Sequence, residues 1–196
     1  FHTQVAGVSL TAQQPMNNIA RVTIQALAAV CGGTQSLHTN SYDEALGLPT
    51  EESATVALRT QQIIAEESGA ASVVDPLGGS YLVEMLTDEI YSKSKSKILE
   101  IEEMGGAMKS IEAGFQQKEI HEAAWEHLNQ VESGERRIIG VNHGVLDEQK
   151  MPPVLKPDEN LGITQREKLA NIRSNRDNGA VEESLNEIRI AARNDT

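Results

Sequence analysis

The segment at residues 32–49, GGTQSLHTNSYDEALGLP, places small polar side chains between two apolar helical stretches. Asp43 and Glu44 are expected to open a new helical turn. Hydroxyl, amide and imidazole groups can donate or accept hydrogen bonds, so together they could hold a polar ligand from several directions. The alternative is a buried connection in which these groups satisfy the backbone and each other. The hydrogen-bonding residues are Thr34, Gln35, Ser36, His38, Thr39, Asn40 and Ser41.

A second group of polar residues stands at the start of the chain. Residues 1–10, FHTQVAGVSL, alternate bulky or apolar with polar side chains and then reach Gly7. This pattern predicts a short strand followed by a turn at which another group can come close to the backbone. His2 and Gln4 would share one face of that strand, because strand side chains alternate with a period of two. They could grip a ligand together, although a lone strand histidine more often fills a structural role.

The elements around these two segments form a recognisable unit. Residues 19–30 are apolar so continuously that they predict a largely buried helix, which Gly32 and Gly33 stop. Residues 34–39 are predicted to be a second strand. A strand, a helix and a strand in succession form a βαβ unit with parallel strands, and ligands of such folds bind at the carboxyl ends of the strands. Residues 4–7 and 38–44 would lie there.

The rest of the chain is predicted to be mainly helical. Thr50 should cap a helix that ends near residue 68, and Trp125 should anchor the packing of a later helix. Residues 136–141 are predicted to form a short strand, and three prolines make residues 151–157 a linker. Further helices are expected at residues 83–103, 107–113 and 118–132, and two amphipathic ones within residues 164–192, separated near 175–179.

Composition narrows the class of partner. The 196 residues carry a net charge of −12, which works against binding to nucleic acid or an anionic membrane surface. Cys31 is the only cysteine, so no internal disulfide can form and a reducing compartment is expected. Because no apolar run approaches membrane-spanning length and no leader is evident, we expect a cytoplasmic protein.

Several stretches together closely resemble the large catalytic subunit of the methylmalonyl-CoA mutase family. The enzymes of this family are adenosylcobalamin-dependent acyl-CoA mutases. The resemblance begins at FHTQ with Gly7 and SLT, continues through residues 15–49, and fades after about Asn142. Val5 is a departure, because the family usually has a small hydroxyl residue there. Further matching segments are RTQ at 59–61, ESG at 67–69, DP at 75–76, GGSY at 78–81 and EIEEMGG at 100–106.

The resemblance implies a fold: an α/β fragment, mainly helical, made of the last βα units of a (β/α)8 barrel followed by a helical extension. Residues 1–80 would be the end of the barrel, residues 81–150 the extension, and residues 151–196 a linker with the C-terminal helices. It also implies that the pantetheine arm of coenzyme A threads the barrel axis and that the corrin covers one end.

The resemblance also assigns roles to individual residues. Glu44 would hydrogen-bond the ribose hydroxyls of the adenosyl group, and Gly7 would let the corrin approach the backbone. His2, Gln35 and Ser36 would line the acyl-CoA path. The remaining cofactor-binding residues implied are Gln4, Asn40, Ala45 and Gly47.

Important parts of the family's machinery are missing from this sequence. It has no D-x-H-x-x-G, the motif whose histidine ligates cobalt in the family, so no metal ligand is expected here and a cobalamin-binding domain or small subunit would supply one. No complete catalytic set is expected either, and the full enzyme should be a dimer or heteromer. The alternatives are isobutyryl-CoA mutase or a related acyl-CoA mutase, and, in another class, a helical interaction module that binds no ligand when isolated.

Overall fold

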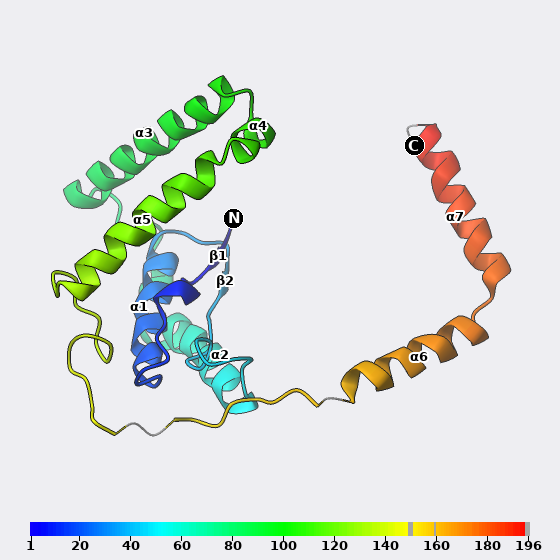
Figure 1. Ribbon diagram of the computed structural model, residues 1–196, viewed down its shortest axis with the longest axis horizontal. Helices are drawn as coiled ribbons and strands as arrows, with labels where there is room; N and C mark the ends of the chain where they lie inside the picture. Colours follow the sequence, from blue (N-terminus) through cyan, green and yellow to red (C-terminus); the bar gives the residue numbers. More distant parts are fainter. Residues whose placement is uncertain (149–150, 159, 195–196) are drawn as a thin grey trace. The chain divides into compact units, whose positions relative to one another are not determined.

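The computed structural model describes residues 1–148, 151–158 and 160–194 of the chain (Figure 1). The chain divides into two compact units, Phe1–Leu155 and Lys156–Thr196. The first unit contains the strands and most of the helices, and it carries the polar segments described above. Each unit is therefore described by itself.

Two short parallel strands form the only sheet of the described residues. β1 (His2–Gln4) pairs with β2 (Ser36–His38), with His2 opposite Ser36 and Gln4 opposite His38. The helix α1 (Asn17–Cys31) connects them, so the predicted parallel βαβ unit is confirmed. Successive side chains alternate between the two faces of the pair. His2, Gln4, Ser36 and His38 consequently share one face.

The core lies on the other face of the strands. Val5 and Leu10 pack there with Val22 and Ala26 of α1 and with Ile64 of α2 (Glu51–Glu67). The side chain of Val5 is 5% exposed, so it belongs to this core and not to the polar face. The departure noted at residue 5 therefore removes no hydrogen-bonding group from the polar face.

β1 is shorter than the strand predicted from residues 1–10. A 3-10 helix, η1 (Gly7–Ser9), begins three residues after the strand ends. The reason is that the Ala6 N–H donates to the side chain of Gln25 on α1 at 2.8 Å, and the Leu10 N–H donates to the Gly7 carbonyl at 2.9 Å. These hydrogen bonds turn the chain at Gly7.

α1 is less buried than its apolar sequence predicts. Its buried residues are Asn18, Val22 and Ala26, a stripe with a spacing of four, while Ile24 is 69% exposed. The strands and α2 cover only this stripe. The prediction of a largely buried helix is therefore wrong for the chain as described.

Three helices follow as a hairpin. α3 (Tyr81–Glu103) and α5 (Phe115–Glu132) run side by side and are joined through α4 (Ala107–Glu112) (Figure 1). Lys97 Nζ on α3 pairs with Glu119 on α5 at 3.0 Å and lies 5.1 Å from the centre of the Phe115 ring.

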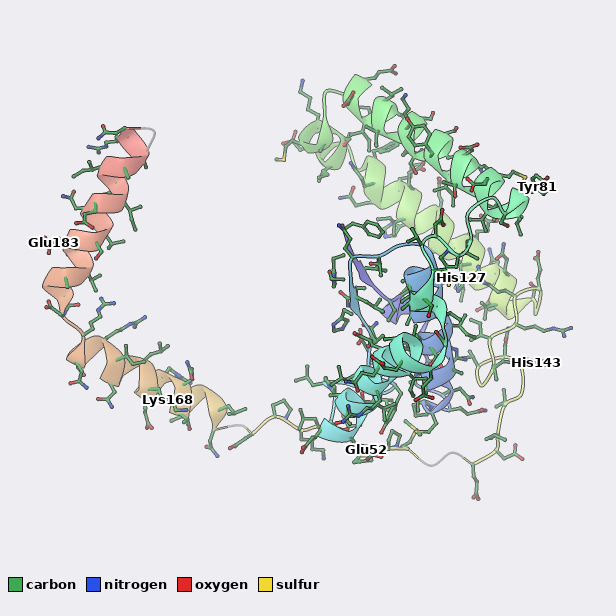
Figure 2. All side chains as sticks on the ribbon, turned by 180° about the vertical axis from the view of Figure 1, so that it is seen from behind. Glu52, Tyr81, His127, His143, Lys168 and Glu183 are labelled. Atoms are coloured by element: carbon green, nitrogen blue, oxygen red, sulfur yellow. The ribbon has the colours of Figure 1, made fainter. Side chains whose placement is uncertain are left out.

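Apolar side chains of this hairpin remain on its surface. Tyr81, labelled at the start of α3 in Figure 2, is 95% exposed. Trp125 is 66% exposed, so the prediction that it anchors packing is wrong here.

Residues 136–141 form a turn and not the predicted strand. The Ile138 N–H donates to the side chain of Asn142, and the Ile139 carbonyl accepts from Arg21 of α1. Only an isolated parallel bridge joins Ile139 to His143. The backbone groups that a strand would use are thus engaged by side chains.

The second unit contains α6 (Leu161–Asn175) and α7 (Asn178–Arg193), which confirms the two predicted C-terminal helices. Lys168 and Glu183 mark them in Figure 2. The Asp177 carboxylate caps α7 by accepting from the Ala180 N–H at 3.1 Å. Residues 151–158 before α6 have no regular structure, as their prolines predict. In the described part of the chain, no helix combines the length and apolarity needed to cross a membrane.

Replacing the residue that caps α2 should destabilise the first unit. Thr50 Oγ1 accepts from the N–H of the fully buried Ser53 at 3.2 Å. We expect Thr50→Ala to cost about 1 kcal/mol, the usual contribution of an N-cap side chain, and to lower the Tm of the intact protein in calorimetry. Thr55→Ala, an exposed threonine of the same helix, is the control. A Tm for Thr50→Ala at or above that of the control would contradict the assignment.

Candidate functional site

Gln4 and Asn40 meet at the carboxyl ends of the two strands. Gln4 Nε2 donates to Asn40 Oδ1 at 3.4 Å, and Asn40 Nδ2 donates to the Val5 carbonyl at 3.2 Å. Asn40 is 1% exposed, so its amide is fixed in place. The two residues, 36 apart in sequence, thus form one polar surface.

Gly7 brings Glu44 into the same group. A Cβ atom built on Gly7 would lie 2.6 Å from Glu44 Oε1 and 2.8 Å from Asn40 Nδ2. Both distances are shorter than Cβ contacts in folded proteins. The side chains of Asn40 and Glu44 therefore occupy the space that only glycine leaves open at this position.

The loop between Thr39 and Thr50 is held by its own hydrogen bonds. The buried Asp43 accepts from the Thr50 N–H through Oδ2 at 3.2 Å, and its carbonyl accepts from the N–H groups of Leu46 and Gly47. This closes one helical turn, as predicted for this segment. Glu44 points outward from the turn and is exposed. The loop is ordered by Asp43, which leaves Glu44 available for a ligand.

The protonation state of Tyr42 bears on the charge of this loop. Its side chain is buried, and burial raises the pKa of the phenol, with further increases from the nearby carboxylates of Glu52 and Asp43. The phenol is therefore neutral at physiological pH, and the loop gains no charge from it.

His2 and Ser36 form a second pair on the same face of the strands. His2 Nδ1 lies 2.7 Å from Ser36 Oγ, and the two residues are opposite each other in the strand register. Both side chains are exposed. His38, opposite Gln4, lies on this face as well. It was counted among the hydrogen-bonding residues of the segment but was assigned no ligand, and the strand period places it on this face, because it is two residues after Ser36.

The other predicted residues lie around this group. Gln35 precedes β2, with its N–H donating to the Phe1 carbonyl at 3.2 Å, and is exposed. It lines a hollow together with Ser36, Val30 of α1 and Leu58 of α2. Ala45 and Gly47 lie in the turn after Glu44, and both are exposed. A Cβ on Gly47 would come within 3.1 Å of Val154 Cγ1.

Comparison with known proteins identifies the family of this chain. The family model described as "Methylmalonyl-CoA mutase" matches residues 1–196. This chain belongs to the methylmalonyl-CoA mutase family. The family match extends beyond Asn142, where the resemblance by motif fades, and includes both units of the structure.

Individual relatives are identical to the chain at about half of the aligned positions. A probable mitochondrial methylmalonyl-CoA mutase of Caenorhabditis elegans is 49% identical over 98% of the chain and 26% of its own length. The methylmalonyl-CoA mutase of Escherichia coli K12 is 48% identical over 97% of the chain and 27% of its length. The large subunit of 2-hydroxyisobutanoyl-CoA mutase of Aquincola tertiaricarbonis is 45% identical over 100% of the chain and 35% of its own length. The chain thus spans between a quarter and about a third of the length of these relatives.

Two residues that hold the site were missed as functional candidates. Asn18 is fully buried, and it donates to the Tyr42 carbonyl at 2.8 Å. Arg21 donates to Asn18 Oδ1 at 2.7 Å. The sequence carried a signal, because Asn18 stands four residues before Val22 and eight before Ala26, on the buried stripe of α1. A polar residue on such a stripe needs buried partners.

A metal site was not expected in this sequence. Within the described residues, no group of three or more histidine, cysteine, aspartate or glutamate side chains is placed to hold an ion. His127 Nδ1 of α5 lies 3.1 Å from Arg136 Nη1, within hydrogen-bond distance.

A methyl group on Gly7 should disturb the site without unfolding the protein. In Gly7→Ala, the carboxylate of Glu44 and the amide of Asn40 must move away from their present positions. Overpacking of this kind costs about 1–3 kcal/mol, so we expect the affinity of the full-length protein for adenosylcobalamin to fall about tenfold or more. Absorbance titration measures this affinity. Gly32→Ala, which adds the same methyl at the end of α1, is the control, and an equal effect of both changes would contradict the assignment.

Proposed function

We propose that this chain is part of an adenosylcobalamin-dependent acyl-CoA mutase and provides part of its cofactor-binding surface. One observation carries the proposal: Gln4, Gly7, Asn40 and Glu44 meet at the carboxyl ends of two adjacent parallel strands. Ligands of parallel α/β folds bind at that end. In this family assignment, the observed βαβ unit is the end of the catalytic barrel.

The proposed fold of the complete domain is a (β/α)8 barrel. β1 and β2 would be its last two strands, and α1 and α2 would be helices of its outer ring. Residues 1–80 would complete the barrel, residues 81–150 would form a helical extension, and residues 151–196 a linker with the C-terminal helices. The exposed apolar side chains of α1 support this proposal, since a closed barrel with its helix ring would cover more of that helix.

The residues of the site fit adenosylcobalamin. The exposed carboxylate of Glu44 has two oxygens that can accept from two vicinal ribose hydroxyls. Gly7 lacks the Cβ that would displace this carboxylate, and it allows a large planar ring to approach the backbone. Gln4 and Asn40 supply fixed amides, while the small residues Ala45 and Gly47 leave room beside the corrin. When bound, the cofactor supplies the radical chemistry of the carbon-skeleton rearrangement.

The second pair on the polar face would serve the acyl-CoA substrate. His2 and Ser36 are exposed and hydrogen-bonded to each other, so together they present a fixed donor and acceptor to the barrel interior. Gln35 would contribute from the start of β2. The chain's own residues bind and orient the substrate, and no residue of a complete catalytic set is assigned here.

The proposed reaction is the interconversion of methylmalonyl-CoA and succinyl-CoA. An alternative substrate, isobutyryl-CoA or that of a related acyl-CoA mutase, is also consistent with this region. The relatives named for methylmalonyl-CoA and for 2-hydroxyisobutanoyl-CoA are 48% and 45% identical to the chain, so this segment discriminates little between acyl groups. Residues outside it would select the substrate.

The proposed partners follow from the missing cobalt ligand. A cobalamin-binding domain, on the same protein or on a small subunit, would supply that ligand and dock against the helices after residue 80, within a dimer or heteromer. The name of the 2-hydroxyisobutanoyl-CoA mutase relative includes the words "large subunit", which supports a two-subunit arrangement as one option. We propose no role for nucleic acid or membranes. A cytoplasmic location also stays a proposal, since some relatives are named as mitochondrial.

The alternative of a ligand-free interaction module makes a different prediction. It would explain the exposed apolar side chains of α3 and α5. It would leave the polar surface at Gly7 without a function. Titration of the chain with cobalamin and acyl-CoA separates the two, because binding of either ligand would contradict the module.

The role of Glu44 can be tested by neutralising its charge. Glu44→Gln keeps one acceptor oxygen and loses the negative charge. Because hydrogen bonds to charged groups contribute about 1.5–3 kcal/mol, the affinity of the full-length enzyme for adenosylcobalamin should fall about 10- to 100-fold. The affinity for methylcobalamin, which has no ribose on the upper face, should change little. Glu51→Gln, an exposed acid in the first turn of α2, is the control, and unchanged adenosylcobalamin affinity in Glu44→Gln would refute the role.

The role of His2 can be separated from that of Glu44. We expect His2→Ala to raise the KM for the acyl-CoA substrate about fivefold, as expected for one lost hydrogen bond of about 1 kcal/mol, with adenosylcobalamin affinity unchanged. Steady-state kinetics and cofactor titration measure the two effects. His143→Ala, in the turn after α5, is the control. A loss of adenosylcobalamin affinity with an unchanged KM would contradict this role, because it would mean that His2 contacts the cofactor and not the substrate.

A further inference from the structure

Asn18 connects three segments of the first unit through one side chain. Its Nδ2 donates to the carbonyls of Tyr42 at 2.8 Å and Thr11 at 2.9 Å. Its Oδ1 accepts from the Thr11 N–H at 3.1 Å and from Arg21 Nη1 at 2.7 Å. An amide has two N–H groups and two oxygen lone pairs, so every hydrogen-bonding position of this side chain is used.

The orientation of this amide is fixed by charge. The guanidinium of Arg21 has only donors, so it selects the oxygen of Asn18 and leaves the NH2 group directed at Tyr42 and Thr11. Arg21 is itself held, because its Nη2 donates to the Ile139 carbonyl at 2.7 Å. The turn that carries Ile139 and His143 lies beside α1 (Figure 2), where Gln14 also donates to the Gly144 carbonyl at 2.8 Å.

The Tyr42 carbonyl is a critical point of the site. It stands two residues before Glu44 and two after Asn40, in the loop that presents both side chains. Asp43 closes the later part of this loop through Thr50, and Asn40 ties its beginning to Val5. Asn18 is the contact that ties the middle of the loop to α1. Without it, the backbone between these two attachments could shift.

We propose that Asn18 is a positioning residue for the cofactor, which acts by fixing the loop that carries Glu44, with Arg21 holding its amide in the required orientation. This inference rests on the proposed function and adds to it two residues that touch no ligand. Their contribution is specific: they set where the Glu44 carboxylate stands, and hence how well the protein distinguishes adenosylcobalamin from methylcobalamin.

The test uses the full-length enzyme and the near-isosteric change Asn18→Asp. The carboxylate can still accept from Arg21 and Thr11, but it cannot donate to the Tyr42 carbonyl. The readout is the ratio of the Kd for methylcobalamin to the Kd for adenosylcobalamin, measured by absorbance titration. We expect this ratio to fall about tenfold, since a buried carbonyl left without its donor disfavours the native loop, with the Kd for acyl-CoA unchanged. Asn17→Asp, whose side chain donates to Gln14 and not to the loop, should leave the ratio unchanged.

A second variant keeps the inference testable if Asn18→Asp does not fold. Arg21→Met preserves most of the side-chain length and removes the three hydrogen bonds that the guanidinium donates, to Asn18 Oδ1, Thr11 Oγ1 and the Ile139 carbonyl. The Asn18 oxygen then keeps only the Thr11 N–H as a donor, so the amide is held less firmly in its orientation. The ratio should fall about threefold to tenfold. An unchanged ratio in the folded variant, or in both if both fold, would overturn the inference.

Comparison with Glu44→Gln separates this inference from the proposed function. If Asn18 acts through Glu44, adding Asn18→Asp to Glu44→Gln should lower the ratio no further. A further fall of the same size in the double variant would overturn the positioning role. If Glu44→Gln lowers the ratio and Asn18→Asp does not, the positioning inference alone fails. If Glu44→Gln has no effect, the role proposed for Glu44 fails first.

Discussion

The parallel pairing of β1 with β2 determines the position of every polar group in the candidate site. The register sets His2 opposite Ser36 and Gln4 opposite His38, which puts four polar side chains on one face and Val5 on the other. A shift of one residue would reverse these faces and bury the polar groups against α1 and α2. The two strands have only three residues each, so the register depends on the surrounding contacts. Gln61 of α2, which donates to the Leu37 carbonyl at 3.1 Å, is one of these contacts.

Much of this arrangement could be predicted from local sequence patterns. The glycine pair after α1, the alternation in β1 and the Thr50 cap are local signals, and α1, α2 and the two strands lie where they were expected, with β1 shorter than predicted. The βαβ pattern predicted that residues 4–7 and 38–44 lie at the same strand ends, the family resemblance selected Gln4, Gly7, Asn40 and Glu44 among them, and the structure brings these four residues together. Their roles toward the cofactor stay predictions, as do those of His2, Gln35, Ser36, Ala45 and Gly47.

The errors have a common physical origin. The burial of Trp125 and of most of α1 was predicted from residue type, but burial depends on what packs against a helix, which a short window of sequence does not contain. The strand predicted at residues 136–141 did not form, since Arg21 of α1 and the adjacent Asn142 engage its backbone groups. Asn18 was missed because its importance lies in partners at Thr11 and Tyr42. Such long-range satisfaction of a buried amide has only a weak signal in sequence.

His2 and Ser36 are 34 residues apart in the sequence, and this separation bears on how the newly made protein folds. Closing a loop of that length costs entropy before any contact is gained, so the polar face does not exist in a partly folded chain and forms only when the strands come together. A molecule that binds this face therefore recognises the native chain alone. By mass action, the concentration of that molecule in the cell would affect the fraction of newly made protein that stays folded and escapes degradation.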